Sequence, residues 1–304
     1  VARLSGDEFL VVMPAATSTG AREVARRICE VFTEPFELIG TAWVTASVGV
    51  ATAATAAGLD AGTLIRDADT AMYEAKAAGR GGFVVFDPSM RAESERQLEL
   101  HNGLHLAIER DEFEVHYQPI VDGMSGTVHG VEALVRWQSP TGTVMPDQFI
   151  SLAEDSGLIG AIGQIVLDRA CDQVARWRRL PGCAHLTLSV NVSARQVLDA
   201  DLVAVVAHAI DHAGLEPDAL WLEITESMMM VDTRDTTETL AAIRGLGVHL
   251  SVDDFGTGNS SLSYLQRFPV EQVKIDRQFV TGMLEHSEDA AVVTAVIGMA
   301  DALG

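Results

Sequence analysis

The run Ser251-Val252-Asp253-Asp254-Phe255-Gly256-Thr257-Gly258 determines how the rest of the chain is interpreted. It begins inside an apolar stretch typical of a buried strand, and it continues into two adjacent carboxylates and a loop with two glycines. Neighbouring carboxylates repel one another unless a cation lies close by, so this strand end is a candidate metal site. Because Asp and Gly are also common turn residues, an ordinary polar turn explains the run equally well.

Around this run, apolar segments alternate with amphipathic ones from residue 114 onward. Strands are predicted over 114–121, 128–137, 185–192, 219–225, 248–253 and 270–275. Helices are predicted over 146–156, 161–179, 202–213, 233–246, 260–266 and 289–303. Repeated units of one apolar strand and one helix are typical of a parallel sheet covered by helices, so the sequence predicts an α/β barrel-like domain with about six strands.

Five of the predicted strands carry polar side chains near their carboxyl ends. These are Glu132, Asn191, Glu223, the pair Asp253 and Asp254, and Lys274. In parallel barrels these ends meet on one face, where active sites are found. Any single one of these residues is readily explained as a structural group with a partner, since an unpartnered buried charge is costly. Converging oxygen donors in this number instead indicate a site for hard cations, and the Asp pair would suit two of them.

This segment resembles the EAL family of cyclic-di-GMP phosphodiesterases, whose motifs it carries in the family's order from about residue 99 to its end. The matching runs are Tyr117-Gln118-Pro119-Ile120, Glu132-Ala133-Leu134-Val135-Arg136-Trp137, Pro146-Asp147-Gln148-Phe149-Ile150-Ser151-Leu152-Ala153-Glu154, Ser189-Val190-Asn191-Val192-Ser193, Leu222-Glu223-Ile224-Thr225-Glu226-Ser227, Asp253-Asp254-Phe255-Gly256-Thr257-Gly258 and Val273-Lys274-Ile275-Asp276. The resemblance implies a (β/α)8 TIM-like barrel. The family's later Ala-Glu-Gly-Val-Glu motif is absent, so the barrel is expected to be truncated here.

The resemblance also implies an activity and a set of metal ligands. The activity would be hydrolysis of cyclic-di-GMP to linear pGpG by a water that two metal ions activate. One Mg²⁺ or Mn²⁺ would be bound by Glu132, Asn191, Glu223 and Asp253. Asp254 would bind the second ion.

Further roles follow from the same resemblance. Lys274 would contact the nucleophilic water, and Glu226 would steady the loop after the Asp pair. Contacts to the substrate would come from Gln118, Leu134 and Arg136. Two copies of the domain would form a homodimer. Asn259 stands where the family usually has an aromatic residue, which puts the rigidity of that loop in question.

The first part of the chain has a different pattern, with strands predicted over 1–4, 10–13, 43–51 and 83–86 and helices over 21–32 and 61–78. This indicates a mixed α+β unit. Three runs resemble the GGDEF family of diguanylate cyclases: Arg3-Leu4-Ser5-Gly6-Asp7-Glu8-Phe9, Ala46-Ser47-Val48-Gly49-Val50-Ala51 and Asp67-Ala68-Asp69-Thr70-Ala71-Met72-Tyr73-Glu74-Ala75-Lys76. Ser5 replaces the motif's first Gly, and the first half of that domain has no counterpart here. We therefore expect GTP as a ligand only of an intact domain, and no cyclase activity from this chain as it stands.

A charged stretch over residues 91–110 predicts a helix between the two patterns. The expected organisation is a partial GGDEF-like domain over residues 1–88, a helical linker over 89–110 and an EAL domain, incomplete at its carboxyl end, over 111–304. A non-catalytic cyclic-di-GMP receptor and a bifunctional full-length cyclase and phosphodiesterase are the alternatives left open.

Composition narrows the possible partners and location. The 304 residues carry a formal net charge of −22, which disfavours DNA as a partner because phosphate binding needs Lys and Arg. The three cysteines lie far apart, and no apolar run reaches the ~18–20 residues that span a bilayer. A cytoplasmic location is expected, whereas the sequence says nothing of a membrane or sensor segment upstream. The basic cluster Arg176, Arg178 and Arg179 is interpreted as the solvated end of a helix.

Overall fold

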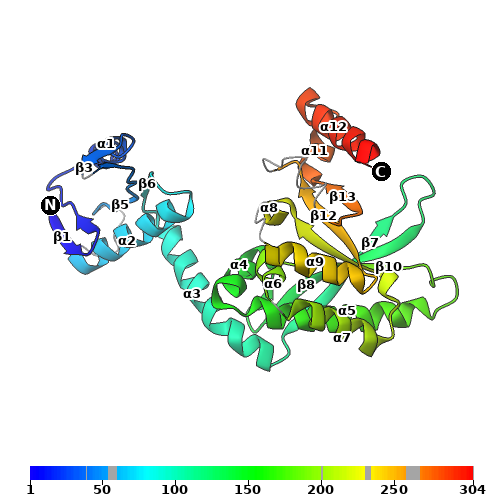
Figure 1. Cartoon of the computed structure of the whole chain (residues 1–304). Coiled ribbons are helices and arrows are strands. Elements are labelled where there is room, and N and C mark those ends of the chain that lie inside the picture. The colour runs from blue at the N-terminus through cyan, green and yellow to red at the C-terminus, as the bar shows by residue number, and fades with distance from the viewer. Residues whose placement is uncertain (39, 54–59, 200, 230–233, 258–267, 304) are drawn as a thin grey trace. The chain divides into compact units, whose positions relative to one another are not determined.

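The computed structural model describes residues 1–38, 40–53, 60–199, 201–229, 234–257 and 268–303 (Figure 1). Its contacts divide the chain into two units, Val1–Leu100 and His101–Gly304. None of the helices in the described part of the chain is long and apolar enough to cross a membrane.

Unit 1 confirms the strand predicted over 1–4 and both predicted helices, whereas the strand predicted over 10–13 is wrong in its extent, because the observed strand ends at Leu10. Strands β1 (Ala2–Ser5) and β2 (Glu8–Leu10) pair in antiparallel fashion. Helix α1 (Ser18–Val31) begins after Thr17, whose side chain accepts a hydrogen bond from the Gly20 amide. Helix α2 (Ala61–Ala77) begins after Asp60, which caps the Thr63 amide in the same way. Such caps satisfy amide groups that have no partner within the helix.

The strand predicted over 43–51 is wrong in its extent. Only β5 (Val48–Val50) forms a ladder, in parallel with β6 (Phe83–Val85). A separate hairpin of β3 (Phe36–Leu38) and β4 (Gly40–Ala42) precedes it, and the sequence pattern did not reveal it. The apolar side chain of Trp43 favoured a strand in the sequence, but Trp43 is 74% exposed. A strand also needs a neighbouring strand for its backbone hydrogen bonds, and Trp43 has none in the ladders described for this unit.

Helix α3 (Pro88–Glu109) confirms the helix predicted over 91–110 and extends it by one turn at its start. Within unit 1, Arg91 of α3 forms an ion pair of 2.5 Å with Asp67 of α2. The Arg91 guanidinium also lies over the ring of Phe86, 5.5 Å from its centroid. The first turn of α3 is therefore attached to α2 and to the end of β6.

Unit 2 is built on one mixed sheet. Its strands are β7 (Phe113–Val121), β8 (Val128–Ser139), β9 (Gly142–Val144), β10 (Thr187–Asn191), β11 (Leu220–Thr225), β12 (His249–Phe255) and β13 (Gln272–Ile275). Their order is β13-β12-β11-β10-β8-β7, and β9 pairs with β8. Strands β8 and β10 to β13 are parallel, as predicted.

The first predicted strand of this sheet departs from the all-parallel expectation. Strand β7 is antiparallel to β8, and so is the short β9, which the sequence interpretation did not include. The reason is the short connection between β7 and β8, where Asp122 accepts hydrogen bonds from the amides of Met124 and Ser125. A tight turn can join only antiparallel neighbours, because a parallel pair needs a crossover of a dozen or more residues.

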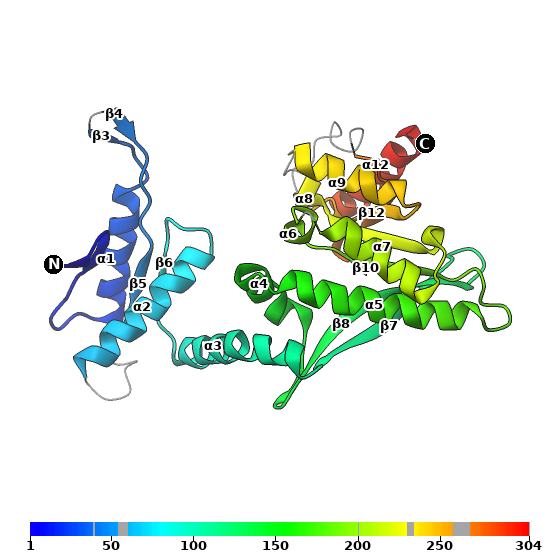
Figure 2. The same ribbon diagram turned by 60° about the horizontal axis from the view of Figure 1, so that its bottom comes forward.

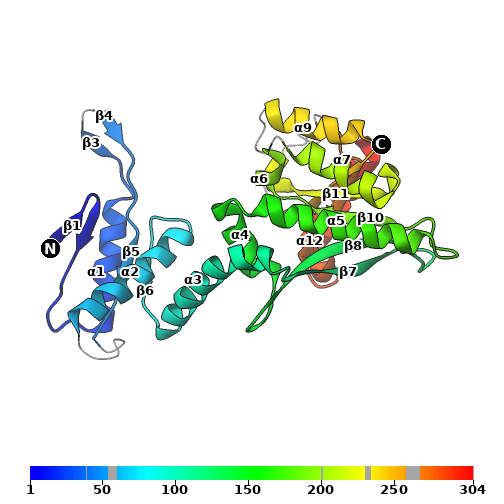
Figure 3. The same ribbon diagram turned by 90° about the horizontal axis from the view of Figure 1, so that it is seen from below.

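Helices line the sheet of unit 2. They are α4 (Pro146–Ser156), α5 (Ile159–Arg178), α6 (Ala194–Val197), α7 (Leu202–Ala213), α8 (Glu226–Met229), α9 (Arg234–Gly245), α11 (Arg277–Gly282) and α12 (Ser287–Leu303), with a 3-10 turn at Pro217–Ala219. Helix α5 packs against β7, β8, β10 and α7 (Figures 2 and 3). The helix predicted over 260–266 lies outside the described residues. All six other helices predicted in this unit or its linker are confirmed to within three residues at each end.

Candidate metal centre

Strand register brings the first three predicted ligands onto one face of the sheet. Glu132 of β8 lies opposite Ser189 of β10, and Asn191 follows Ser189 by two residues. Asn191 in turn lies opposite Glu223 of β11. Because side chains two residues apart in a strand point to the same face, each step stays on that face.

The next strand continues the same pattern. Glu223 lies opposite Ser251 of β12, and Asp253 follows Ser251 by two residues. Carboxylate oxygens of Glu132, Glu223 and Asp253 all lie within 4.8 Å of one another. In the described part of the chain, this is the one group of three or more His, Cys, Asp or Glu residues with metal-ligand spacing. Asn191 Nδ2 donates to Glu132 Oε1 at 2.8 Å, so its amide oxygen remains available as an acceptor.

Lys274 of β13 lies between these carboxylates. Its Nζ is 2.6 Å from Glu223 Oε2, 3.3 Å from Asp253 Oδ2 and 3.4 Å from Glu132 Oε2. Burial on its own would lower the pKa of the Lys274 ammonium, but the carboxylates, Glu223 foremost, raise it above its ordinary value. Lys274 is therefore a fixed positive charge within the cluster.

Glu223 gives the clearest sign that the cluster suits a further cation. Its side chain is fully buried, and its Oε1 has no hydrogen-bond partner among the described residues. Burial raises the pKa of this carboxyl, against the opposing pull of the Lys274 ammonium. A buried polar atom without a partner is costly, and three carboxylates exceed the charge of one ammonium. Carboxylate and carboxamide oxygens are the donors that hard divalent cations prefer, so these residues fit such an ion.

Asp254 lies outside that cluster because β12 carries a bulge. The pairing with β13 shifts register between Val252 and Phe255, and Asp254 adopts a left-handed φ of 55°. Burial raises the pKa of the Asp254 carboxyl, and the neighbouring Asp253 and Asp276 raise it further. A bulge redirects a side chain from the regular alternation of the strand. The structure thus separates the two aspartates and places Asp254 beside Asp276.

The three predicted substrate contacts line the same face as Glu132. Gln118 of β7 lies directly opposite Glu132 in the antiparallel ladder. Leu134 and Arg136 follow Glu132 at intervals of two along β8, and both are partly exposed. Arg136 Nη1 donates to the carbonyl of Val135 at 2.7 Å. All three side chains thus belong to the face that holds the carboxylates.

Glu226 contacts the segment that follows the aspartate pair. It is the first residue of α8, it is 2% exposed, and its Oε2 accepts a hydrogen bond of 2.7 Å from the Gly256 amide. Gly256 has a φ of 102° and faces Phe279 of α11. Asn259 lies outside the described residues.

Sequence reasoning assigned no role to Asp276 or Phe279, which the structure places beside Asp254 and Gly256. Asp276 belongs to the run Val273-Lys274-Ile275-Asp276, so a signal for it was present. Phe279 offered none, because its contact with Gly256 depends on how α11 packs.

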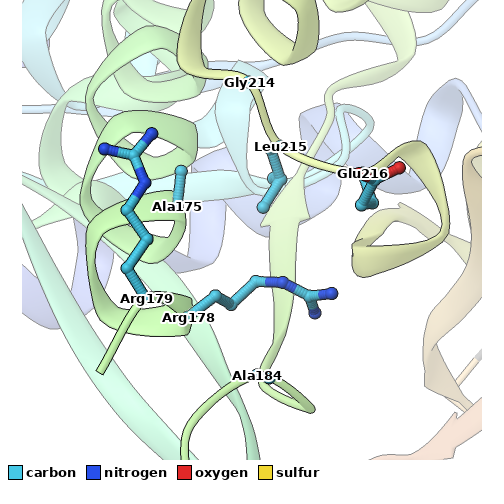
Figure 4. A pocket seen from close by; sticks show the side chains of 7 residues that line it. All are labelled: Ala175, Arg178, Arg179, Ala184, Gly214, Leu215 and Glu216. Carbon is cyan, nitrogen blue, oxygen red and sulfur yellow. The ribbon is translucent and has the colours of Figure 1, made fainter. Parts of the chain in front are cut away.

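The basic cluster at the end of α5 does not converge on one point. Arg178 and Arg179 line a shallow hollow with Glu216, and Figure 4 shows their guanidinium groups lying apart. Arg178 Nη1 donates to the carbonyl of Leu186 at 2.6 Å, and Arg176 pairs with Asp172 at 3.6 Å. This arrangement agrees with a solvated helix end.

Parallel strands covered by helices, with a cluster of carboxylates gathered on one face of the sheet, place unit 2 among the TIM-barrel-like α/β proteins. The chain belongs to the EAL family: the model described as EAL domain matches residues 101–304. The model described as Diguanylate cyclase, GGDEF domain, matches residues 1–82.

Relatives with curated descriptions contain both regions. The chain is 40% identical over 301 residues to the bifunctional diguanylate cyclase/cyclic di-GMP phosphodiesterase MucR of Pseudomonas aeruginosa, covering 98% of this chain and 44% of that protein. It is 37% identical over 305 residues to the cyclic di-GMP phosphodiesterase PdeR of Escherichia coli, covering 100% of this chain and 46% of that protein. The chain thus spans less than half the length of these relatives.

Solved structures agree with the fold. A complex described as PaMucR phosphodiesterase with c-di-GMP matches with a TM-score of 0.64 and 44% identity, over 67% of this chain and 83% of that one. The FimX EAL domain from Pseudomonas aeruginosa, bound to c-di-GMP, matches with a TM-score of 0.58 and 24% identity, over 66% of this chain and 80% of that one. At that identity the second match supports the fold alone.

Proposed function

We propose that unit 2 hydrolyses one phosphodiester bond of cyclic-di-GMP to give linear pGpG. The observation that carries this proposal is the cluster of Glu132, Glu223 and Asp253, whose oxygens lie within 4.8 Å of one another on one face of the sheet. The activities named for MucR and PdeR support the choice of substrate.

The proposed roles follow the geometry of the face. Glu132, Asn191, Glu223 and Asp253 would hold one Mg²⁺ or Mn²⁺, and Asp254 would serve a second. Bound ions of this kind activate a water and stabilise charge on a phosphoryl group. Lys274 would orient the attacking water, since its ammonium lies among the carboxylates. Glu226 is a positioning residue, because it holds the Gly256 amide.

Substrate contacts are assigned to the β7 and β8 edge of the same face. Gln118 would donate to or accept from the guanine or ribose of the dinucleotide through its amide. Leu134 would pack against an apolar surface of the substrate. Arg136 would bind a phosphate oxygen, for which a guanidinium offers two parallel donors.

The test is turnover of cyclic-di-GMP by the purified chain with Mg²⁺ or Mn²⁺, with chelator as a control. Glu132→Ala is expected to abolish turnover, whereas Asp172→Ala, which alters a partly exposed acid on α5, is expected to keep it. Absence of metal-dependent turnover by the unaltered chain, or equal activity of the two variants, contradicts the proposal. Binding of cyclic-di-GMP without turnover would favour a non-catalytic receptor.

A second activity is favoured by the GGDEF match over residues 1–82 and by the bifunctional description of MucR. We propose that a longer protein containing this chain binds GTP at a complete GGDEF domain, next to a helical linker over residues 89–110, and that its EAL domain over 111–304 forms homodimers. GTP turnover and the oligomeric state of the longer protein test these two points.

A further inference from the structure

We infer that Lys274 is an internal counter-ion that competes with the metal for the carboxylates, so that it lowers the affinity of the centre for the ion while keeping the acidic strand ends assembled. This inference deepens the proposed function, because it rests on Glu132, Glu223 and Asp253 being metal ligands. It concerns a property of the centre that precedes any reaction and can be measured without substrate.

The distances carry the first step. Nζ of Lys274 lies within 3.4 Å of one oxygen from each of the three carboxylates, which themselves lie within 4.8 Å of one another. A cation held by all three carboxylates must enter the space that this ammonium shares. Two positive groups repel strongly at such separations, most of all beside the buried Glu223. The ion and the ammonium therefore cannot both keep their best positions.

The second step concerns where the ammonium can go. Lys274 is the next-to-last residue of β13, and its side chain is 28% exposed. Its flexible four-carbon stem allows the charge to move toward the open side of the face. A lysine that only contacted an attacking water would have no need to bridge three acids. Bridging them gives Lys274 two tasks, which are to neutralise the acids and to give way to the ion.

The two tasks predict opposite effects for one substitution. Removing the charge with Lys274→Met leaves three acids facing one another, so the metal-free protein becomes less stable. The same change removes the competitor, so the ion binds more tightly. A residue with a merely structural role would lower stability without tightening metal binding.

The experiment is calorimetric titration of the metal-free chain with Mn²⁺. Lys274→Met is expected to tighten Mn²⁺ binding at least tenfold, or about 1.4 kcal/mol. The control, Arg277→Met, removes one positive charge from an exposed residue three positions later and is expected to change the affinity less than twofold. Lys274→Arg keeps the charge and is expected to stay within about threefold of the unaltered chain. Thermal unfolding should show a lower midpoint for metal-free Lys274→Met and a larger rise on adding Mn²⁺.

Unchanged or weaker Mn²⁺ binding in Lys274→Met overturns the inference, as does an equal gain in Arg277→Met or a lack of Mn²⁺ binding by every variant. Circular dichroism checks that Lys274→Met is folded. If it is not, Lys274→Gln, which also removes the charge, takes its place in the titration. Tighter binding in a chain that never hydrolyses cyclic-di-GMP would support the inference and contradict the proposed function. The two failures are therefore distinguishable.

Discussion

Two acidic runs lie near strand ends in the described part of this chain, and only one of them joins a cluster of carboxylates from other strands. In unit 1, Asp7 lies in the turn between β1 and β2 and Glu8 begins β2; both are exposed, and Glu8 accepts a hydrogen bond from Ser5. In unit 2, Asp253 lies near the end of β12, where its carboxylate meets those of Glu223 from β11 and Glu132 from β8. The two runs are thus similar in sequence. They differ in whether other strands of the same sheet bring further carboxylates next to the run.

The largest expected effect contrasts an acid of the carboxylate cluster in unit 2 with an acid of the exposed run in unit 1. Glu223→Gln keeps the shape of the side chain but removes the buried charge that Lys274 contacts at 2.6 Å. Hydrolysis of cyclic-di-GMP is expected to fall at least about 100-fold, or about 2.7 kcal/mol of barrier. Glu8→Gln is expected to change it less than twofold. Initial rates at saturating Mn²⁺ measure both, and similar losses in the two variants would show that the runs are not separate in function.

The second prediction concerns the packing of α2 against β5 in unit 1, the unit whose acidic run is exposed. Position 49 has room only for glycine, because α2 lies directly against β5 there. An added Cβ would come within 1.8 Å of the Ala68 carbonyl oxygen and 2.4 Å of the Met72 nitrogen. Both contacts are backbone atoms of α2, which cannot move without disturbing the helix. Gly49→Ala is therefore expected to lower the unfolding free energy of unit 1 by about 3 kcal/mol. Hydrogen exchange of α2 amides measures this loss.

The matched control for that change is Gly82→Ala, which has open space around an added Cβ and no positive φ. It is expected to leave α2 protection unchanged. Hydrolysis by unit 2 should survive both substitutions. A loss of hydrolysis in Gly49→Ala would mean that the fold of unit 2 depends on unit 1.

Much of the fold, and the set of residues that gather on one face of the sheet, could be predicted from the sequence. The alternation of apolar and amphipathic segments indicates the strands and helices, and the order of the motifs indicates the residues. Parallel strands place residues by register, and intervals of two kept Glu132, Asn191, Glu223 and Asp253 on one face. The antiparallel direction of β7 was missed although the predicted bounds leave only residues 122–127 between the two strands, which are too few for a parallel crossover.

The finer geometry of the site could not be predicted, because it depends on packing between distant segments. The bulge in β12 changes the direction of the Asp254 side chain relative to that of Asp253, and an Asp-Asp pair in a sequence does not predict a bulge. Lys274 was expected near a water, whereas the structure shows it bridging three carboxylates. Such contacts depend on the positions of four strands at once.

The third prediction compares a buried ion pair with an exposed one inside unit 1. Asp67 is 1% exposed and pairs with Arg91, so Asp67→Asn leaves the guanidinium without its partner charge. The expected cost is about 2 kcal/mol of unfolding free energy, within the range for breaking buried polar pairs. Glu23→Gln, which removes an exposed partner of Arg26, is expected to leave the denaturation midpoint unchanged. Equal shifts would contradict the structural distinction between the two pairs.

The smallest expected effect compares the glycines that flank the two acidic runs. Gly256 has a φ of 102°, and an added Cβ would lie 2.9 Å from Phe279 Cε2 and 3.3 Å from Val292 Cγ1. Phe279 can shift slightly, so Gly256→Ala is expected to slow hydrolysis only about tenfold, through a loop that Glu226 no longer holds in place. Gly6 has a φ of 43° with open space around it, so Gly6→Ala should leave hydrolysis unchanged. Restoration of the Gly256→Ala rate by Phe279→Leu, which gives the new methyl room, would assign the loss to this contact; an unchanged rate in Gly256→Ala itself would show that the centre tolerates movement of its loop.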